Sequence, residues 1–424
     1  MSKKTVIGLL GLGTVGSGTV KVLSKFDNIV IKNIAVRDIS KKRNIEGLDD
    51  NILTTNAEQL VNDPEINIIV EVMGGLNPAF DLIKKAILNH KHIVTANKDL
   101  IARHGETLFN LASENNVVIM YEAAVAGGIP IIMPLKQSLA GNRITKIAGI
   151  MNGTTNYILT KMESEGSEFS TVLKEAQELG YAEADPSGDV QGHDAANKIS
   201  ILASLAFNKR IDVDKIYREG IDYISPVDIS YASEFGYNIK LIALAQEVKD
   251  EILDIRVHPM LVSKKHPLAH INDVMNAVFI EGDAIGQVMF SGPGAGEMPT
   301  ASSVAGDVLS IASELEINEY PLPMMRCNHE SSAEQLNIND SMSRYYIRVN
   351  TDNLPGVIGD LGLTCGRNGI NLCSIIQKGL LPDGTARIVL LTELAYEKDI
   401  QNAIKEMYLK RTMKRVENVI RVMN

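Results

Sequence analysis

The chain has 424 residues, of which 45% are hydrophobic and 22% are charged. This length exceeds one ordinary hydrophobic core and predicts two or three domains, and the composition is typical of a soluble globular protein. A formal net charge of −10 argues against a nucleic-acid partner, which needs a basic face, and no apolar run reaches the roughly 18 residues that span a bilayer.

The chain opens with a predicted strand, a glycine-rich turn and a helix. Lysines before an apolar run also occur in signal peptides, but a glycine inside this run and the lack of a small-residue cleavage site favour a strand. In the turn pattern G-x-G-x-x-G, the glycines allow a tight turn, the approach of a pyrophosphate and the packing of helix on strand. The strand "IVIKNIAV" follows at the right distance, which predicts a dinucleotide site at the helix N-terminus. The residues expected to contact the cofactor there are Gly11, Gly13, Thr14, Val15 and Gly16.

The residues after the second strand bear on the choice between NAD and NADP. Arg37 and the run "DISKKR" carry positive charge, which favours the 2′-phosphate of NADP. Asp38 keeps NAD open, because a carboxylate at this place binds the ribose 2′-hydroxyl. A solvated charge run without a ligand is the plain alternative. We expect NADP, with Arg37 as the phosphate contact.

Strands and helices continue to alternate through "INIIVEVMGG", "HIVTANK" and "VVIMYEAAVAGG". This alternation predicts a parallel, doubly wound sheet that binds ligands at the carboxyl ends of its strands. Gly74, Thr95 and Lys98 follow or end such strands and are expected to contact the cofactor. For Lys98 the alternative is a solvated loop residue.

The middle of the chain has a different pattern. "RITKIAGIMNGTTNYIL" predicts a strand, a polar turn over residues 152–156 and a helix. Thr154 or Thr155 is expected to cap that helix, and the same free amides could hold a carboxylate. A further helix, "TVLKEAQELG", is expected to end at Gly180.

The segment from Gly180 to Phe207 holds four carboxylates and then an almost uncharged apolar helix, which predicts burial. Asp194 and Lys198 are one turn apart and share a face. A weak surface ion pair is the plain alternative, but the apolar surroundings argue against it. A buried ammonium loses hydration, which favours the neutral amine and suits proton transfer. "ADPSGD" is a turn sequence, so Asp185 and Asp189 are expected to be turn formers.

Several of these motifs occur in the order found in one family. "GLLGLGTVG", "TANK", "YEAAVAGGIPII", "MNGTTNYIL", "GYAEADPSGDVQGHDAANK" and "GPGAGEMPTASSVAGD" together resemble homoserine dehydrogenase over residues 1–320. The resemblance implies an oxidoreductase that interconverts L-homoserine and L-aspartate 4-semialdehyde with NAD(P), in the biosynthesis of threonine, methionine and isoleucine.

The resemblance also implies site residues. Lys198 matches the family's proposed proton-transfer lysine, and Lys98 matches a second lysine near the nicotinamide. Either could be the base, and we favour Lys198 because its setting is more apolar. The residues expected to bind substrate are Glu183, Asp194, Asn152, Thr154 and Tyr181, and two further cofactor contacts are Gly180 and Gly296.

A monovalent cation, Na⁺ or K⁺, is implied in the loop after "YE" and is expected to be structural. Glycine in this loop exposes backbone carbonyls easily, and a plain strand-to-helix turn is the alternative. The expected ligands are Glu122, Val125, Gly127 and Ile129.

From Tyr345 the pattern is strand, helix, strand, strand, helix, strand, a ferredoxin-like order. With the start "DNLPGVIGDL" it resembles an ACT domain, which implies an amino-acid effector near Gly356, with threonine as the first candidate. A role in dimerisation alone is the alternative. Cys327, Cys365 and Cys373 show no metal-ligand spacing and favour a reducing cytoplasm.

The expected fold is therefore α/β in three domains. A Rossmann-type NAD(P)-binding domain covers residues 1–132, with a helix around 298–316 packing back on it. An α+β catalytic and dimerisation domain covers 133–320, and a polar linker, 321–343, leads to an ACT domain over 344–424. The family implies a homodimer or homotetramer. Two other hypotheses stay open: an inactive amino-acid sensor that keeps the NADP fold, and an NADP-linked dehydrogenase of another small zwitterion.

Overall fold

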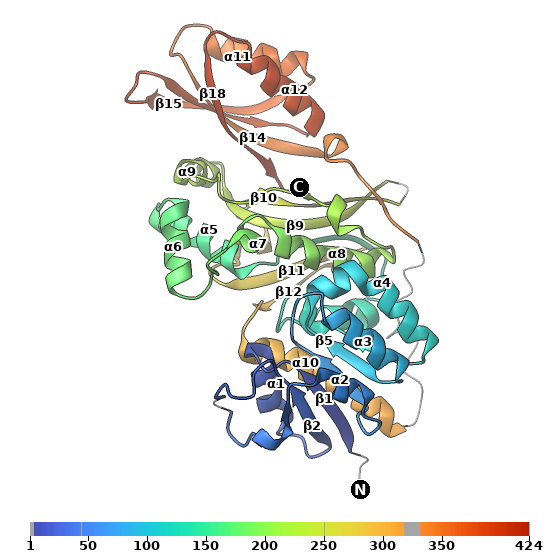
Figure 1. The fold of residues 1–424 in the computed structure, drawn as a ribbon. Helices are drawn as coiled ribbons and strands as arrows, with labels where there is room; N and C mark the ends of the chain where they lie inside the picture. Colours follow the sequence, from blue (N-terminus) through green and yellow to red (C-terminus); the bar gives the residue numbers. More distant parts are fainter. Residues whose placement is uncertain (1–3, 44, 250, 318–330, 424) are drawn as a thin grey trace. The chain divides into compact units, whose positions relative to one another are not determined.

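The computed structural model describes residues 4–43, 45–249, 251–317 and 331–423 of the chain (Figure 1). Cys327 and the first part of the expected linker lie outside these ranges. The chain divides into two compact units that alternate along the sequence. The first comprises Met1–Ile147, Ala196–Lys215 and Met275–Ala333, and the second comprises Ala148–Ala195, Ile216–Val274 and Glu334–Asn424. Strand β7 (Ile144–Ile150) and helix α8 (His193–Phe207) each run from one unit into the other.

The first unit contains a six-stranded parallel sheet in the order β3-β2-β1-β4-β5-β6. Its strands are β1 (Thr5–Leu10), β2 (Ile29–Ala35), β3 (Leu53–Thr54), β4 (Ile68–Glu71), β5 (His92–Thr95) and β6 (Ile119–Met120). The connecting helices are α1 (Thr14–Leu23), α2 (Ala57–Asn62), α3 (Ala79–Leu88) and α4 (Lys98–Glu114). This strand order is that of the Rossmann fold, so the predicted doubly wound sheet is confirmed.

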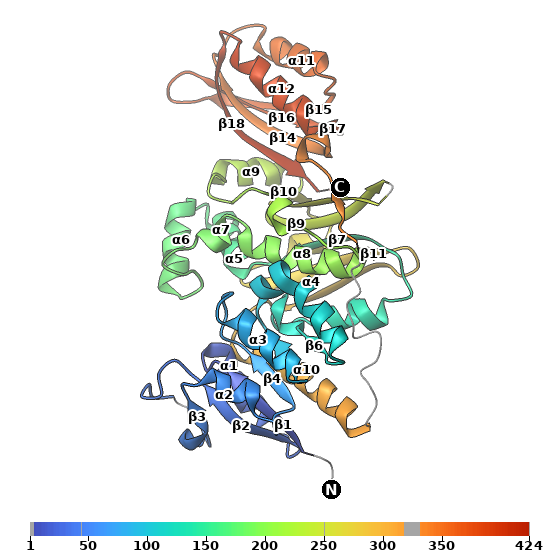
Figure 2. The ribbon, with the colours of Figure 1, turned by 45° about the vertical axis from the view of Figure 1, so that its right-hand side comes forward.

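Helix α10 (Glu297–Ile317) packs on this sheet although it lies far along the chain (Figure 2). Its residues Val304, Val308 and Ile311 recur on one face and share a core cluster with Ile7 of β1. Helices α1 and α10 approach closely at Gly18, where a Cβ would lie 2.6 Å from the Glu297 carbonyl oxygen. The hairpin of β11 (Met275–Gly282) and β12 (Gly286–Pro293) precedes α10 in the same unit.

The second unit contains the long antiparallel pair β9 (Tyr237–Lys249) and β10 (Ile252–Ser263). The short strand β8 (Tyr217–Arg218) pairs with β10 in parallel. The helices of this part are α5 (Gly153–Glu165), α6 (Phe169–Glu178), α7 (Ser187–Val190), α9 (Pro226–Glu234) and the start of α8. Helices α5, α7 and α8 carry most of the predicted substrate residues.

The C-terminal part of the second unit, Met342–Val422, has the expected βαββαβ order. Its sheet order is β18-β14-β16-β15, with every neighbour antiparallel. Its elements are β14 (Met342–Thr351), α11 (Val357–Arg367), β15 (Leu372–Leu380), β16 (Ala386–Thr392), α12 (Glu397–Tyr408) and β18 (Met413–Val422). A short additional strand, β17 (Ala395–Tyr396), pairs with the start of β14. We call Met342–Val422 the C-terminal module.

Strand β18 also pairs in parallel with β10, through Met260 with Arg421 and Leu261 with Val422. The strands of the module and of the β9–β10 pair therefore form one sheet within the second unit. Strand β13 (Glu334–Gln335), which falls in the expected linker, pairs with β10 as well.

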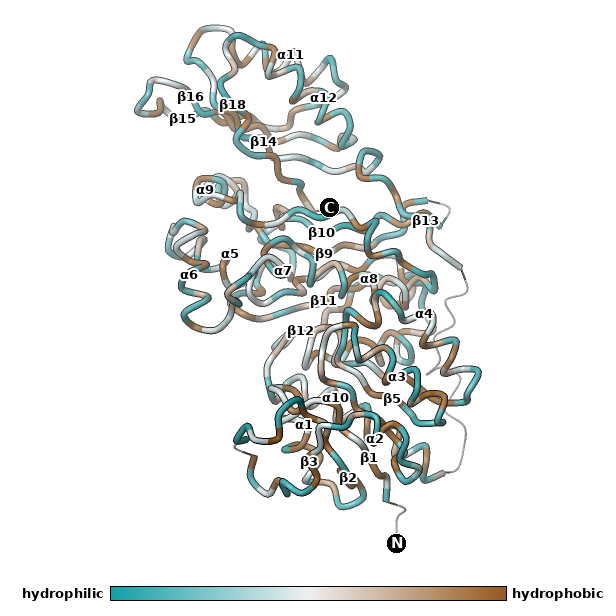
Figure 3. Tube along the Cα trace, viewed as in Figure 1, coloured by the Kyte–Doolittle hydropathy of each residue, from teal (hydrophilic) through white to brown (hydrophobic). Residues whose placement is uncertain are grey.

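The loop after β2, which carries Arg37 and Asp38, contains a stretch of hydrophilic residues (Figure 3). Across the described ranges, no helix combines the length and the apolar composition of a transmembrane span.

Candidate functional site

The glycine turn after β1 leaves open space at the start of α1. Gly11 has a φ of +103°, and a Cβ there would lie 2.9 Å from the Val72 carbonyl oxygen. A Cβ at Gly16 would lie 2.3 Å from the Gly11 carbonyl oxygen, so neither position admits a side chain. At Gly13, the N-cap of α1, a Cβ would meet nothing within 4 Å. The backbone at Gly13 is therefore uncovered at the N-terminus of α1, and helix N-termini favour phosphate groups.

The loop after β2 carries the two residues that bear on the cofactor. Arg37 and Asp38 are both exposed. The Asp38 carboxylate accepts hydrogen bonds from the Ser40 hydroxyl at 2.6 Å and the Ser40 amide at 2.8 Å, which lower the pKa of Asp38. The Asp38 carboxylate is thus engaged within its own loop.

Glu71 organises the carboxyl ends of β4 and β5. Its side chain is fully buried and accepts hydrogen bonds from the Thr95 hydroxyl at 2.7 Å, the Met73 amide at 2.8 Å and the Gly74 amide at 3.2 Å. Burial raises the pKa of Glu71, and the Thr95 hydroxyl opposes that shift. Sequence reasoning selected Gly74 and Thr95 but missed Glu71. The available signal was an acid that ends the apolar run "INIIVE".

Lys98 begins helix α4 at the same edge of the sheet. The preceding residue, Asn97, is the N-cap: its side-chain oxygen accepts from the Leu100 amide at 3.2 Å. The Asn97 side-chain amide also donates to the Gly75 carbonyl oxygen at 2.6 Å. These bonds fix the start of α4 against the turn at Gly74 and Gly75, so Lys98 lies at the ligand-binding edge that the alternation predicts.

A hydrogen bond brings the positions of the two lysines together. The Asn197 side-chain amide on α8 donates to the Asp99 carboxylate on α4 at 2.6 Å, and both residues belong to the first unit. Asp99 follows Lys98, and Asn197 precedes Lys198. Lys198 is only 9% exposed, as the apolar helix predicted. Sequence reasoning did not select Asp99 or Asn197.

In the second unit, Asn152 joins two carboxylates. Its side-chain amide nitrogen donates to Asp189 at 2.6 Å and to Asp194 at 3.0 Å. Its side-chain oxygen accepts from the Thr155 amide at 2.9 Å, so Asn152 is also the N-cap of α5. We call Asn152, Asp189 and Asp194 the acid cluster.

The acid cluster corrects two expectations. Helix α5 begins at Gly153, so the cap is Asn152 rather than Thr154 or Thr155, and the expected polar turn is already helical. The Thr155 hydroxyl instead donates to the Asn152 backbone oxygen at 3.1 Å. Asp189 is more than a turn former, because it shares the Asn152 amide with Asp194. Asp185 does form the turn, accepting from the Ser187 amide at 3.1 Å.

Of the remaining predicted substrate residues, Thr154 and Tyr181 meet at the start of α5 in the second unit. The Thr154 hydroxyl donates to the Tyr181 backbone oxygen at 2.6 Å, and the Tyr181 ring lies 5.0 Å from the Tyr157 ring. Gly180 ends the turn after α6 with a φ of +78°. Glu183 is exposed, and its backbone oxygen accepts from the Gln177 side chain at 3.0 Å.

The loop expected to hold a cation is tightly tied. The Glu122 carboxylate accepts from three successive amides, those of Ile131 at 2.5 Å, Ile132 at 2.7 Å and Met133 at 2.8 Å. The Glu122 backbone amide donates at 2.9 Å to Asp307, whose pKa burial raises far above its usual range. Within the described part of the chain, no three His, Cys, Asp or Glu side chains gather as a metal site.

The other residues of that loop are buried and sharply turned. Ala126 and Gly127 both have a φ of +56°, and Val125 and Ile129 are buried. The Gly127 carbonyl oxygen accepts from the Ser303 hydroxyl at 2.7 Å, which leaves one of its lone pairs open. Gly296, at the start of α10, has a φ of +127°, where other residues are strained.

Family models match most of the chain. One described as "Homoserine dehydrogenase, NAD binding domain" matches residues 11–122, and one described as "Homoserine dehydrogenase" matches residues 130–309. A curated homoserine dehydrogenase of Synechocystis sp. is 48% identical over 431 residues and covers 99% of both chains. That of Bacillus subtilis is 38% identical and covers 98% of both.

Solved structures agree with these matches. A homoserine dehydrogenase from Thiobacillus denitrificans is 38% identical, covers 100% of both chains and superposes with a TM-score of 0.93. A hyperthermophilic archaeal homoserine dehydrogenase mutant in complex with NADPH is 30% identical, with a TM-score of 0.63. The match covers 73% of the present chain and 98% of that one.

Proposed function

The chain belongs to the homoserine dehydrogenase family of oxidoreductases, and from this premise we propose that it interconverts L-homoserine and L-aspartate 4-semialdehyde. The observation that carries the proposal is helix α8. Its first turn holds Asp194 of the acid cluster, and the buried Lys198 follows one turn later. An ammonium partner and a proton carrier on one helix suit an amino alcohol.

The acid cluster is proposed to bind the substrate's ammonium group. Asp189 and Asp194 each accept from Asn152 through one carboxylate oxygen, and a carboxylate can accept several hydrogen bonds. Glu183 is the further candidate. Helix N-termini favour anions, so the first-turn amides of α5 are proposed to bind the substrate carboxylate, beside Thr154 and Tyr181.

Lys198 is proposed to take the proton from the substrate hydroxyl and to return it to the carbonyl oxygen in the reverse direction. The bound nicotinamide cofactor supplies the hydride chemistry. Lys98 is the alternative base, and the hydrogen bond between Asp99 and Asn197 supports a shared role, because it holds the two lysine positions together.

NADP is proposed as the preferred cofactor. Exposed Arg37 can bind a 2′-phosphate, and the Asp38 carboxylate is already engaged by Ser40. The glycine turn, Gly74, Thr95, Gly180 and Gly296 are proposed as further cofactor contacts.

One assay tests the proposal. Wild type is expected to oxidise NADPH with aspartate semialdehyde, and Lys198→Ala is expected to lose about 100-fold to 10,000-fold in kcat, the usual contribution of a general acid or base. Lys174→Ala, which removes an exposed lysine of α6, serves as the matched control. Full activity in Lys198→Ala would transfer the role to Lys98. An inactive wild type would favour the amino-acid sensor, and activity only with another zwitterion would favour a different dehydrogenase.

The C-terminal module is proposed to be an ACT domain that binds an amino-acid effector, with threonine as the first candidate. Support comes from a cleft of about 210 Å³ at the start of α11, whose lining includes Asp352, Asn353, Gly356, Gln377 and Ile388. Gly356 has a φ of +94° and opens the helix N-terminus, which suits a carboxylate. This would give feedback control in threonine, methionine and isoleucine biosynthesis. Dimerisation alone remains the alternative role.

A structural Na⁺ or K⁺ is proposed at the backbone carbonyls of Glu122, Val125, Gly127 and Ile129. Three backbone amides engage the Glu122 carboxylate, so its backbone oxygen is the proposed ligand. A higher melting temperature in NaCl or KCl than in tetramethylammonium chloride of equal concentration would support this site, and equal values would contradict it. A cytoplasmic homodimer or homotetramer is proposed from the family alone.

A further inference from the structure

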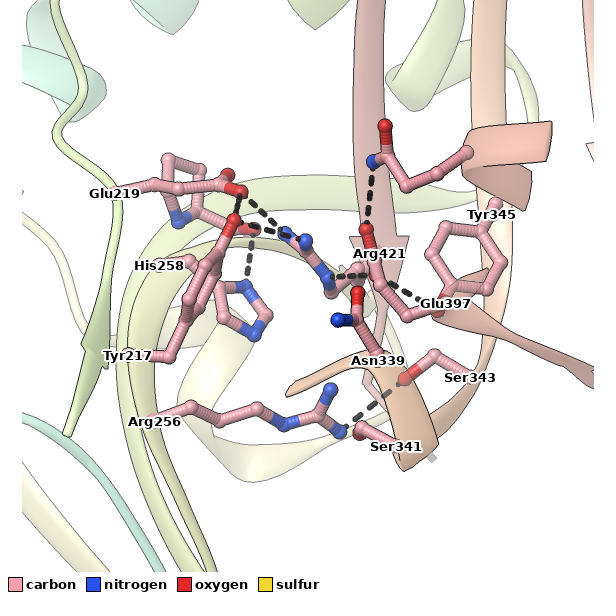
Figure 4. Close-up of polar contacts among 12 residues, drawn as sticks. Tyr217, Glu219, Arg256, His258, Asn339, Ser341, Ser343, Tyr345, Glu397 and Arg421 are labelled. Atoms are coloured by element: carbon pink, nitrogen blue, oxygen red, sulfur yellow. Dashed lines mark hydrogen bonds and ion pairs between the residues drawn. The ribbon is translucent and has the colours of Figure 1, made fainter. Parts of the chain in front are cut away.

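A buried arginine lies where the C-terminal module joins strand β10. Arg421 of β18 is 2% exposed and binds two carboxylates (Figure 4). Its Nε donates to Glu397 at 2.8 Å, and its Nη1 donates to Glu219 at 2.9 Å. Burial by itself would lower the pKa of Arg421, but Glu219 and Glu397 raise it well above its usual range. The guanidinium is therefore charged and held from two sides.

The two carboxylates belong to different parts of the second unit. Glu397 begins α12 of the module and accepts from Tyr345 of β14 at 2.9 Å. Glu219 follows β8, outside the module, and accepts from the Tyr223 hydroxyl at 2.8 Å. Arg421 thus ties the module to the segment that starts at Glu219.

That segment contacts the end of α7 directly. The Ile221 amide donates to the Val190 carbonyl oxygen at 3.0 Å. At Gly220 a Cβ would lie 2.6 Å from the same oxygen, so the two backbones touch. The Gln191 side chain also donates to Asp222 at 3.1 Å. Residues 219–222 therefore support Val190 and Gln191.

Val190 adjoins Asp189 of the acid cluster. Asp189 and Asp194 flank the turn at Gly192, whose φ is +78° and where a Cβ would lie 3.1 Å from a Val257 methyl carbon. The Glu219 amide donates to the Val257 carbonyl oxygen at 2.9 Å. Glu219 is thus bonded to the residue of β10 that contacts Gly192, and the two residues after Glu219 contact Val190, next to Asp189.

We propose that Arg421 is a positioning residue, through which the C-terminal module holds residues 189–194 in their substrate-binding arrangement by way of Glu219. The proposal rests on the assignment of the acid cluster to the substrate's ammonium group. The alternative is that this buried ion pair affects only the stability or the specificity of folding. The test must therefore measure substrate affinity and stability separately.

Glu219→Gln and Glu397→Gln form a matched pair in the full-length protein. Each removes one carboxylate charge from the same arginine, but only Glu219 belongs to the segment that contacts Val190 and Gln191. Glu219→Gln is expected to raise the KM for L-homoserine about threefold to tenfold, as coupled positions do. Its kcat should stay within about twofold, because the ammonium is bound alike in ground and transition states. The KM for NADP should not change, because the proposed cofactor residues do not belong to residues 189–194 or 219–222.

Glu397→Gln is expected to lower the melting temperature and leave both KM values near wild type. Equal changes in the KM for homoserine in the two variants, or no change in either, would overturn the proposal. If Glu219→Gln does not fold, Glu219→Asp replaces it. That variant keeps the charge but shortens the side chain, so the proposal still requires a raised KM.

Asp194→Asn separates two kinds of failure. A normal KM for homoserine in Asp194→Asn would overturn the assignment of the acid cluster, and with it the present proposal. A raised KM there together with a normal KM in folded Glu219→Gln would overturn only the coupling through Arg421.

Discussion

At the scale of single residues, Arg37 governs the expected cofactor preference. Arg37→Asp places a carboxylate where the 2′-phosphate of NADP is proposed to bind. A lost charge-assisted hydrogen bond is worth about 1.5–3 kcal/mol, so kcat/KM for NADP should fall at least about tenfold relative to that for NAD. Steady-state kinetics with both cofactors measure this ratio. Lys42→Asp makes the same charge change in the same loop, and an equal loss there would show a general electrostatic effect instead.

His92 makes stability depend on pH. Its ring Nδ1 accepts from the Val118 amide at 3.1 Å, and burial lowers its pKa from 6.5 to about 4. Between these two pKa values the unfolded chain binds a proton at His92 and the folded chain does not. The contribution of His92 to the free energy of unfolding is therefore fully present above about pH 6.5 and is lost as the pH falls toward 4. A shift of this size corresponds to about 3 kcal/mol.

The free energy of unfolding of wild type, measured by denaturant titration between pH 7 and about pH 4, should fall more steeply than that of His92→Asn. Asparagine can keep the acceptor near the Val118 amide but does not titrate. Parallel curves for the two proteins would show that other groups cause the acid loss.

At the scale of elements, patterns along the chain predict which elements form but not which side chains meet. The order β3-β2-β1-β4-β5-β6 follows from alternating strands, helices and the glycine turn, all of which are local signals. Asn152 bonds to Asp189 and Asp194 across 37 and 42 residues, and no periodicity reports such pairs. The same holds for Glu71 with Thr95 and for Asn197 with Asp99.

Asn152 combines two roles at the start of α5, and one substitution separates them. Asn152→Ala loses the helix cap, worth about 1 kcal/mol, and also lets two neighbouring carboxylates repel each other. The melting temperature should fall, and the KM for homoserine should rise several-fold with a smaller change in kcat. Asn56→Ala is the matched control, because Asn56 caps α2 by accepting from the Gln59 amide and lies outside the proposed site. A KM shift of equal size in Asn56→Ala would contradict a specific role for Asn152.

At the scale of the whole molecule, the chain passes repeatedly between its two units. Helix α8 begins in the second unit with Asp194 and continues in the first with Lys198. The ferredoxin-like order of the module could be predicted from its own sequence. The pairing of β18 with β10 could not be predicted, because it joins Met260 to Arg421, which are far apart in the sequence, and no local sequence pattern indicates it. The module is thereby a part of the second unit's sheet.

This continuity shapes the prediction for an effector. Threonine in the cleft at α11 should stabilise the protein by about 2.7 kcal/mol at a concentration 100 times its Kd, because only the folded state binds it. If the effector changes the setting of β18, it should also raise the KM for homoserine. The measurements are the melting temperature and the KM as functions of threonine concentration.

Asp352→Asn removes the carboxylate expected to bind the effector's ammonium group, so both responses should disappear. Asp383→Asn is the control: its exposed carboxylate accepts from the Thr385 hydroxyl at 2.6 Å, and it does not line the cleft. A wild-type response that survives in Asp352→Asn would place the effector elsewhere. If no amino acid changes the melting temperature, the module has only a structural role, in the sheet and in oligomerisation. The module would then affect substrate binding only through the bond between Arg421 and Glu219.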